Sequence, residues 1–333
     1  MKTMKLKLST AIIVLFGLGA QAYEGRVTIR AVDENGNPVA NAKATVQFVL
    51  GVPGGGLGNE KISNVEGLTD TNGICVLTGN GDEGTVGAAV LKEGYYGSGG
   101  HGVEFTNVDL ISHRWLPWNP TITAILQKKG IQVPMYARRV DEIKIPVKDK
   151  PVGFDLEIGD WVAPYGKGET SDFVFEVNVA PPQWRTNWLG TSRRLYVIRD
   201  NKMTLNFSDD GDGIQTVAAM PYGLRLPRRA PLDGYEPQLT KREYSSNGRT
   251  PAHSDYDRNA NYFFRVRTKK DAQGNIVSAL YGKIYGEFNN VASGDKISFT
   301  YYLNPEPNSR NMEFNPKQNL FKNLKPLERV TAP

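Results

Sequence analysis

The residues best suited to hold an ion form a short acidic segment in the second half of the chain. Residues 208–213 read SDDGDG, and the carboxylates of Asp209, Asp210 and Asp212 could offer oxygen ligands to a calcium ion. The spacing differs from that of an EF-hand loop, and no glutamate follows at the distance such a loop requires. Strand-like residues flank the segment, so a tight hairpin loop is the competing interpretation. No other cofactor is expected.

A second candidate site combines tryptophans and arginines. Trp184 and Trp188 lie four residues apart among prolines and hydrogen-bonding side chains. An exposed aromatic ring can stack on the apolar face of a sugar. Arg225, Arg228 and Arg229 form a basic loop that could bind sulfate, phosphate or carboxylate groups. We therefore predict ligand binding, with a glycan as the candidate ligand. Tryptophans that complete the core and a solvated basic loop are the competing interpretations.

Catalytic signatures are scarce in this chain. It holds three histidines and one cysteine, and we find no G-x-S-x-G, H-E-x-x-H or Walker pattern. Cys75 lies in the apolar run ICVL, which predicts a buried, inert thiol. We expect no enzyme activity. A carboxylate pair for glycoside hydrolysis cannot be recognised from spacing, so a carbohydrate-active enzyme or its accessory binding protein stays an alternative.

One glycine motif suggests nucleotide binding but lacks the necessary context. Residues 79–84 read GNGDEG and match G-x-G-x-x-G after an apolar strand pattern. Dinucleotide binding requires a helix that starts at these glycines, because the N-terminus of that helix meets the pyrophosphate. The next residues, TVGAAV, are typical of a strand instead. We therefore predict a hairpin loop between strands.

The first 22 residues are typical of a secretory signal peptide. Three lysines precede the apolar run AIIVLFGLGA, and residues 20–22 read AQA, a small-x-small cleavage signature. The run is about half the length that a spanning helix needs, so an uncleaved anchor is the weaker alternative. We expect an exported mature protein that starts near Tyr23, is periplasmic or at the cell surface, and has no transmembrane segment.

The charge of the mature chain does not favour nucleic acid as a partner. The full chain holds 40 basic and 35 acidic residues, and three of the basic ones lie in the signal, which leaves 37 against 35. Residues 23–130 hold 8 basic and 11 acidic residues, whereas residues 185–270 hold 16 and 9. The second stretch could contact an anionic envelope component such as polysaccharide. A solvated polar face is the competing interpretation.

The N-terminal region carries a recurrent pattern of strands and turns. It consists of a G-x-V strand at 25–27, a D-x-x-G-x-P-V-x-x-A-x-V hairpin at 33–46, a T-D-x-x-G turn at 69–73 and a K-x-G-Y turn at 92–95. This pattern resembles the carboxypeptidase regulatory-like domain, a transthyretin-like, immunoglobulin-like β-sandwich. The resemblance implies the fold but little about function, because this module is attached to many unrelated proteins.

The rest of the chain also reads as all-β. Apolar runs are short and alternate, and glycine and proline are frequent throughout. We predict two antiparallel β-sandwich domains after a cleaved signal peptide. The expected boundaries are 1–22 for the signal, 23–130 for the first sandwich, 131–150 for a linker, 151–303 for the second sandwich and 304–333 for an extended tail.

These observations lead to one functional expectation and one further alternative. We expect an exported, non-enzymatic protein with a structural, adhesive or ligand-binding role at the bacterial envelope. The alternative is a subunit of a surface assembly, in which a strand or the tail 304–333 joins a neighbour's sheet. The sequence leaves the ligand and the oligomeric state open.

Overall fold

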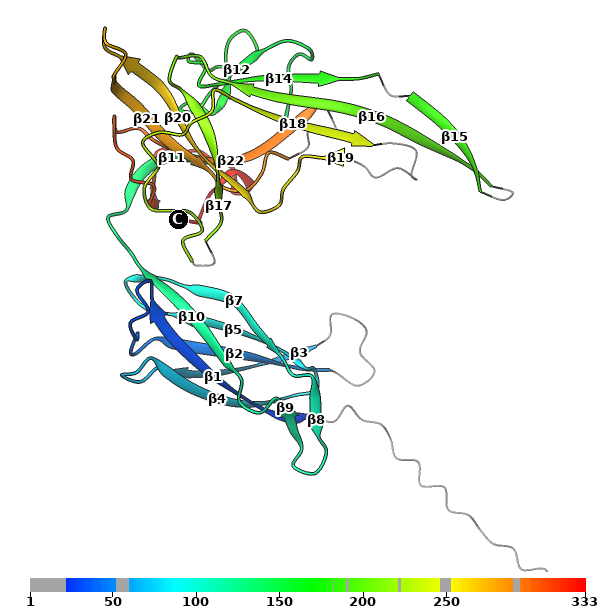
Figure 1. The fold of residues 1–333 in the computed structure, drawn as a ribbon, viewed down its shortest axis with the longest axis vertical. Helices are drawn as coiled ribbons and strands as arrows, with labels where there is room; N and C mark the ends of the chain where they lie inside the picture. The colour runs from blue at the N-terminus through cyan, green and yellow to red at the C-terminus, as the bar shows by residue number, and fades with distance from the viewer. Residues whose placement is uncertain are drawn as a thin grey trace, which may run out of the picture. The chain divides into compact units, whose positions relative to one another are not determined.

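Short alternating runs of apolar and polar residues form strands along nearly the whole described chain. The computed structural model describes residues 22–51, 60–181, 183–189, 192–220, 223–245, 253–289 and 294–333. The fold is all-β, and its described residues form two compact units that divide between Lys128 and Lys129 (Figure 1). The expected signal at 1–22 lies outside the described residues, apart from position 22. Among the described residues, no helix is long and apolar enough to cross a membrane.

The first unit consists of two sheets around one core. Val27 and Ile29 of the first sheet and Ala44 and Val46 of the second are fully buried in that core. The first sheet contains β1 (Tyr23–Asp33), β4 (Ile74–Gly81), β6 (Tyr95–Tyr96), β8 (Asn107–Asp109), β9 (Arg114–Leu116) and β10 (Thr121–Lys128), and the second contains β2 (Lys43–Leu50), β3 (Lys61–Leu68), β5 (Thr85–Leu91) and β7 (Ser98–Glu104).

Two details of this unit differ from the prediction. The turn after Asp33 closes a local hairpin, in which Val32 forms an antiparallel bridge with Pro38. β1 and β2 themselves lie in different sheets, so the predicted hairpin does not extend along these two strands. The Asp33 carboxylate stabilises that turn by accepting hydrogen bonds from the backbone of Asn35 and Asn37. β10 pairs with β1 in parallel. The expectation of a purely antiparallel domain is therefore wrong at this pair.

The second unit contains two larger sheets. One has the strand order β17-β20-β21-β22-β11-β23. The other has the order β13-β12-β14-β16-β18-β19, with β15 paired to β16. The sheet that contains β20 consists of β11 (Val133–Lys144), β17 (Gly213–Ala218), β20 (Ala260–Lys270), β21 (Ile276–Ile284), β22 (Lys296–Asn304) and β23 (Phe314–Asn319). The sheet that contains β16 consists of β12 (Val152–Asp155), β13 (Asp160–Trp161), β14 (Phe173–Val179), β15 (Gln183–Leu189), β16 (Ser192–Asn206), β18 (Gln238–Ser245) and β19 (His253–Ser254).

The sheet that contains β20 is buried on both faces. On one face, Phe264 of β20 lies 5.0 Å from Phe173 of β14 between ring centroids, inside the core between the two sheets. On the other face, Phe263 packs in a separate core with Met312 and Phe314. Segment 304–333, expected as an extended tail, therefore supplies β23, the short 3-10 helix Pro326–Glu328 and part of a core.

Residues 133–144 correct another expectation. The sequence predicts a linker here because prolines and charges interrupt the region, yet these residues form β11, which pairs with β22 and β23. Met135, Ala137 and Val140 are buried. Met135 and Ala137 pack in one core, whereas Tyr136 and Val140 pack against the other, so burial on both faces of the strand outweighs its polar composition.

One ionic cluster joins the two sheets of the second unit. Arg267 of β20 donates two hydrogen bonds to the carboxylate of Asp172, at 2.8 and 3.0 Å. Its guanidinium also forms an ion pair with Glu157, with 3.0 Å between Nη1 and Oε2. Asp172 is 2% exposed. Burial raises the pKa of Asp172, and the Arg267 guanidinium opposes that rise. The pair thus links β20 to the residue that precedes β14.

Candidate binding surfaces

The predicted tryptophans belong to a two-stranded ribbon at the end of one sheet. Residues 183–189 of β15 pair only with residues 192–198 of β16, whereas β14 and β18 pair with the remainder of β16. Figure 1 shows β15 and this part of β16 extending beyond β14 and β18. We call residues 183–189 and 192–198 the β15–β16 ribbon. No third strand pairs with β15 in the part of the chain that the structure describes.

The register of the ribbon places both tryptophan positions on one face. Trp184 faces Val197 and Thr186 faces Leu195 across the two strands. Because paired positions share a face and alternate positions do too, residues 184, 186, 188, 193, 195 and 197 lie on one face, and residues 183, 185, 187, 189, 192, 194, 196 and 198 lie on the other. The side chains of Trp184 and Trp188 lie outside the described residues, so their predicted sugar contact stays a prediction.

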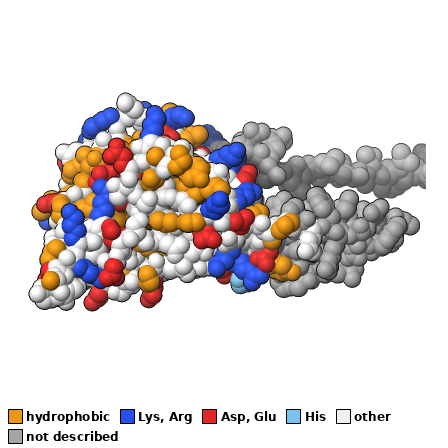
Figure 2. All heavy atoms as spheres, turned by 90° about the horizontal axis from the view of Figure 1, so that it is seen from above, with side chains coloured by type: hydrophobic (Ala, Val, Ile, Leu, Met, Phe, Trp, Pro, Cys, Tyr) orange, Lys and Arg blue, Asp and Glu red, His pale blue; other side chains and the backbone are white. Residues whose placement is uncertain are grey.

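The ribbon is basic as well as partly apolar. Its sequence contains Arg185, Arg193 and Arg194 and no acidic residue. By contrast, Figure 2 shows basic, acidic and hydrophobic side chains interspersed over the visible face of the described residues. A local excess of positive charge therefore sits on a strand pair with an open edge.

The predicted basic loop divides into two different environments. Arg228 and Arg229 line a hollow of about 350 Å³ together with Arg310, while Arg225 is not part of that lining. Instead, the Arg225 guanidinium lies 4.8 Å from the ring centroid of Tyr285. We call the surface formed by Arg228, Arg229, Asn308, Ser309, Arg310 and Asn311 the arginine hollow.

Sequence reasoning missed Arg310 in this hollow. It lies 81 residues beyond Arg229, in a region expected to be a polar tail. The backbone of residues 228–230 runs beside that of 310–312, and an isolated bridge pairs Arg229 with Asn311. No local pattern could have revealed this pairing, because it depends on how the C-terminal segment folds back over the sheet.

The predicted calcium ligands have other partners in the structure. Asp212 is buried and accepts backbone hydrogen bonds from Arg267 and Thr268, and Asp210 forms an ion pair of 2.7 Å with Lys270. Asp209 is exposed. No cluster of three or more potential metal ligands occurs among the described residues. The segment also connects strands of different sheets, β16 and β17, so the competing interpretation as a hairpin was wrong too.

The glycine motif at 79–84 serves packing rather than forming the start of a helix. Residues 79–81 end β4 and residue 85 begins β5 in the other sheet, so the loop connects sheets and is not a hairpin. A Cβ atom on Gly84 would lie 2.6 Å from the carbonyl oxygen of Phe105, and one on Gly79 would overlap the ring of Phe48. The close approach of these neighbours explains the glycines.

The single cysteine and one further tryptophan are core residues. Cys75 is buried, and burial raises the pKa of its thiol. Trp115 stacks on Phe105 with 5.8 Å between ring centroids and donates a hydrogen bond to the Gly81 carbonyl. Neither residue presents a reactive or stacking surface in this structure.

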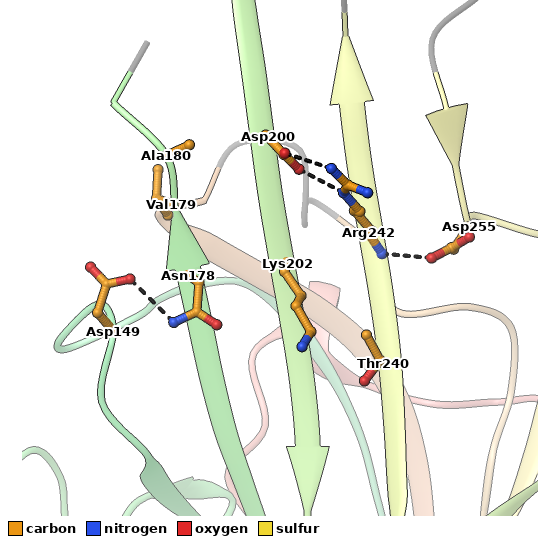
Figure 3. A pocket seen from close by; sticks show the side chains of 9 residues that line it. All are labelled: Asp149, Asn178, Val179, Ala180, Asp200, Lys202, Thr240, Arg242 and Asp255. Atoms are coloured by element: carbon orange, nitrogen blue, oxygen red, sulfur yellow. Dashed lines mark hydrogen bonds and ion pairs between the residues drawn. The ribbon is translucent and has the colours of Figure 1, made fainter.

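A larger polar hollow lies on the outer face of the sheet that contains β14, β16 and β18 (Figure 3). It has a volume of about 670 Å³. Arg242 donates two hydrogen bonds of 2.7 Å to Asp200, and its backbone N–H donates to Asp255. Hydrogen bonds from the guanidinium hold the pKa of Asp200 below its usual range. Asp200 is therefore poorly suited to act as a general acid.

Comparison with known proteins gives only distant similarities. No family model matches the chain, and a search of curated sequences finds no match. A mutant form of the shaft pilin spaA from Lactobacillus rhamnosus GG is 10% identical, over 59% of this chain and 91% of the pilin, with a TM-score of 0.22. A streptococcal ancillary pilin is 14% identical, over 53% of this chain and 59% of the pilin, with a TM-score of 0.19.

Proposed function

We propose that this protein is an exported, non-enzymatic subunit of a surface assembly, and that its partner is a second copy of the chain. The observation that carries the proposal is the β15–β16 ribbon, whose outer strand has no third strand beside it among the described residues. In this reading, β15 of one copy adds to an open sheet edge of the next copy.

The physical argument starts from the cost of an open ribbon. An edge strand presents unpaired N–H and C=O groups that can pair with another chain. A two-stranded hairpin is at best marginally stable in water by itself. The ribbon gains backbone hydrogen bonds and burial of its apolar positions when a third strand joins it, which is the energetic basis of strand addition.

The first unit offers a suitable acceptor edge. β3 ends the sheet β3-β2-β5-β7 and, among the described residues, has no further partner on its outer side. It has 8 residues and β15 has 7, so the two strands match in length. The region 23–130 carries 8 basic and 11 acidic residues, which complements the basic ribbon. A contact between two different surfaces repeats from copy to copy and builds an open chain.

We also propose that the first unit is a carboxypeptidase regulatory-like module with a structural role. Its motifs fall on β1, on the turn into β2, on the turn before β4 and between β5 and β6. Two sheets around one core support that assignment. The module carries no chemistry of its own in this reading and serves as the acceptor for the ribbon.

The charged groups of the second unit support a non-enzymatic role. Asp172 and Asp212 are buried and bind Arg267 and the backbone of β20. The carboxylate of Asp200 in the larger hollow is bound by Arg242. These carboxylates are used to hold strands together, and none of the three is placed to exchange a proton with a substrate.

Shortening the ribbon should abolish self-association. In the variant, residues 183–198 are replaced by a short Gly-Ser turn, which leaves the strands that pair with β14 and β18 in place. We expect wild-type protein to associate as concentration rises, and the shortened variant to stay monomeric, because it lacks the donor edge. Sedimentation velocity across a concentration series measures the difference.

Charge variants provide the matched control for this experiment. R185K/R193K/R194K keeps the ribbon's charge and should associate like the wild type, whereas R185E/R193E/R194E should weaken association most at low salt. Circular dichroism verifies that each variant is folded. A wild-type protein that stays monomeric at every concentration, or a shortened variant that associates equally well, contradicts the proposal.

A further inference from the structure

The arginine hollow has a different chemistry from the ribbon. We propose that it binds the oxyanion of a small acidic ligand, a carboxylate or a sulfate group carried on a saccharide-sized molecule. This site does not depend on self-association. Its volume of about 350 Å³ is at the lower end of the range of small-ligand sites, about 300–1,000 Å³.

Two paired chain segments fix the positions of the arginines. The backbone N–H of Ala230 donates to the Arg310 carbonyl at 2.9 Å, and that of Met312 donates to the Arg228 carbonyl at 2.8 Å. Ala230 and Met312 are fully buried, so the segments are anchored in the core beneath the hollow. Anchored backbone keeps the three guanidinium groups together before any ligand arrives, which lowers the ordering cost of binding.

The guanidinium groups of Arg229 and Arg310 retain hydrogen-bonding capacity toward a ligand. Arg310 donates one bond, to the Ala230 carbonyl at 3.0 Å, and a guanidinium has five N–H donors. Arg229 is exposed, and its side chain has no hydrogen-bond or ion-pair partner among the described residues. Ser309 adds a hydroxyl whose oxygen accepts from Asn304 and whose hydrogen can still donate. Planar guanidinium groups match an oxyanion with paired hydrogen bonds.

Among the described residues of the lining, Glu313 is the one acidic side chain, and its carboxylate is already bound by the backbone. Glu313 is 3% exposed, and its carboxylate accepts a hydrogen bond from the Gly130 backbone at 2.9 Å. Its charge acts on Lys283, which is buried beneath the same segment. Three arginines against one buried carboxylate leave the hollow with an excess of positive charge.

The lining also indicates what the hollow should reject. Of the described residues that line it, Ile131 is the one hydrophobic residue and none is aromatic. Asn308 and Asn311 use their amide groups to hold backbone carbonyls, at Val277 and Ile131. A neutral sugar would therefore find neither a stacking surface nor a set of free amides, so recognition depends on the charged group.

Calorimetric titration of the full-length mature protein tests the proposal with three probes. These are inorganic sulfate, a sulfated disaccharide and a disaccharide that contains a uronic acid, with the uncharged parent disaccharide as the negative probe. We expect the acidic disaccharides to bind and the neutral one to be silent. Comparing the affinity for the sulfated disaccharide with that for the uronic acid disaccharide identifies the preferred oxyanion. The affinity for inorganic sulfate shows how much the saccharide contributes to binding.

Arginine variants locate the binding site. R229A and R310A should each raise the dissociation constant about ten- to hundredfold, because each removes a charge-assisted hydrogen bond to the ligand. R258A removes one exposed arginine outside the lining and should change affinity less than twofold. R310K, which keeps the charge, covers the case in which R310A is unfolded, and it should bind more weakly than wild type.

Three results overturn the proposal. The first is no binding of any acidic probe by the wild type. The second is equal affinity of wild type, R229A and R310K. The third is a loss of affinity in R258A equal to that in R229A and R310A, which would indicate diffuse electrostatic attraction rather than a defined binding site. Failure of self-association leaves this test unaffected, so the two proposals can be judged separately.

Discussion

R267M should lower the free energy of unfolding by about 3–5 kcal/mol, the cost of removing one partner of a buried ion pair. Asp172 is 2% exposed and receives two hydrogen bonds from Arg267. Methionine fills similar space but leaves that carboxylate buried without a cation. Arg267 has a φ of 56°, and methionine has the same backbone preference as arginine, so backbone strain is unchanged. Urea unfolding measures the difference.

The matched control for this prediction is R139M. Arg139 pairs with Asp141 at 3.2 Å on the surface, and both side chains are substantially exposed. A surface pair contributes about 0–1 kcal/mol, so R139M should unfold nearly like the wild type. In R267M the pKa of Asp172 should rise further, since the opposing cation is gone. The deficit should therefore shrink as pH falls, and it should do so above the usual carboxyl range, because the pKa of Asp172 is already raised in the folded wild type. Equal stability of both variants would contradict the role assigned to Arg267.

The second large effect concerns Lys283, which is 1% exposed. Its ammonium group donates to the Met312 carbonyl at 2.8 Å and lies 4.5 Å from the ring centroid of Tyr302. Burial lowers the pKa of Lys283 to about 7, and the charge of Glu313 opposes the shift. The folded state thus releases this proton at a lower pH than the unfolded chain does.

The stability of the wild type relative to K283M should consequently rise with pH. Between the folded pKa of about 7 and the unfolded value near 10.4, the unfolded chain binds one more proton than the folded one, so the slope is positive. The expected gain is about 4 kcal/mol from pH 6 to pH 10. Comparing the two proteins cancels the titration of all other groups. If the difference in free energy of unfolding between the wild type and K283M does not change from pH 6 to pH 10, Lys283 is hydrated or fully ion-paired in the folded protein.

The all-β class was predictable from the sequence because strand periodicity is a local property. Residues 262–267 and 278–284 alternate and are bridged by the 271–275 turn, and they form β20 and β21 as an antiparallel pair. The Asp271 carboxylate accepts hydrogen bonds from the backbone of Gln273 and Asn275, which is the turn chemistry that composition predicts.

Pairing between distant segments was not predictable in the same way. The local pattern does not show that residues 194–198 and 203–207 belong to one strand, yet both lie in β16, whose 15 residues pair with two different sets of neighbours. The expected linker contains β11, whose polar residues conceal that both of its faces pack against cores. Arg310 joined the arginine hollow only through the return of the C-terminal segment. Each of these features depends on partners that lie far away in the sequence.

Hydrogen exchange at the backbone of β15 tests the central claim most directly. The measurement compares dilute wild-type protein with concentrated protein, and uses the ribbon-shortened variant to identify signals that do not come from the ribbon. The account predicts that β15 amides not bonded to β16 become protected as association proceeds, together with amides of β3. Association that leaves the β15 amides exchanging as fast as in the monomer would contradict strand addition at the ribbon.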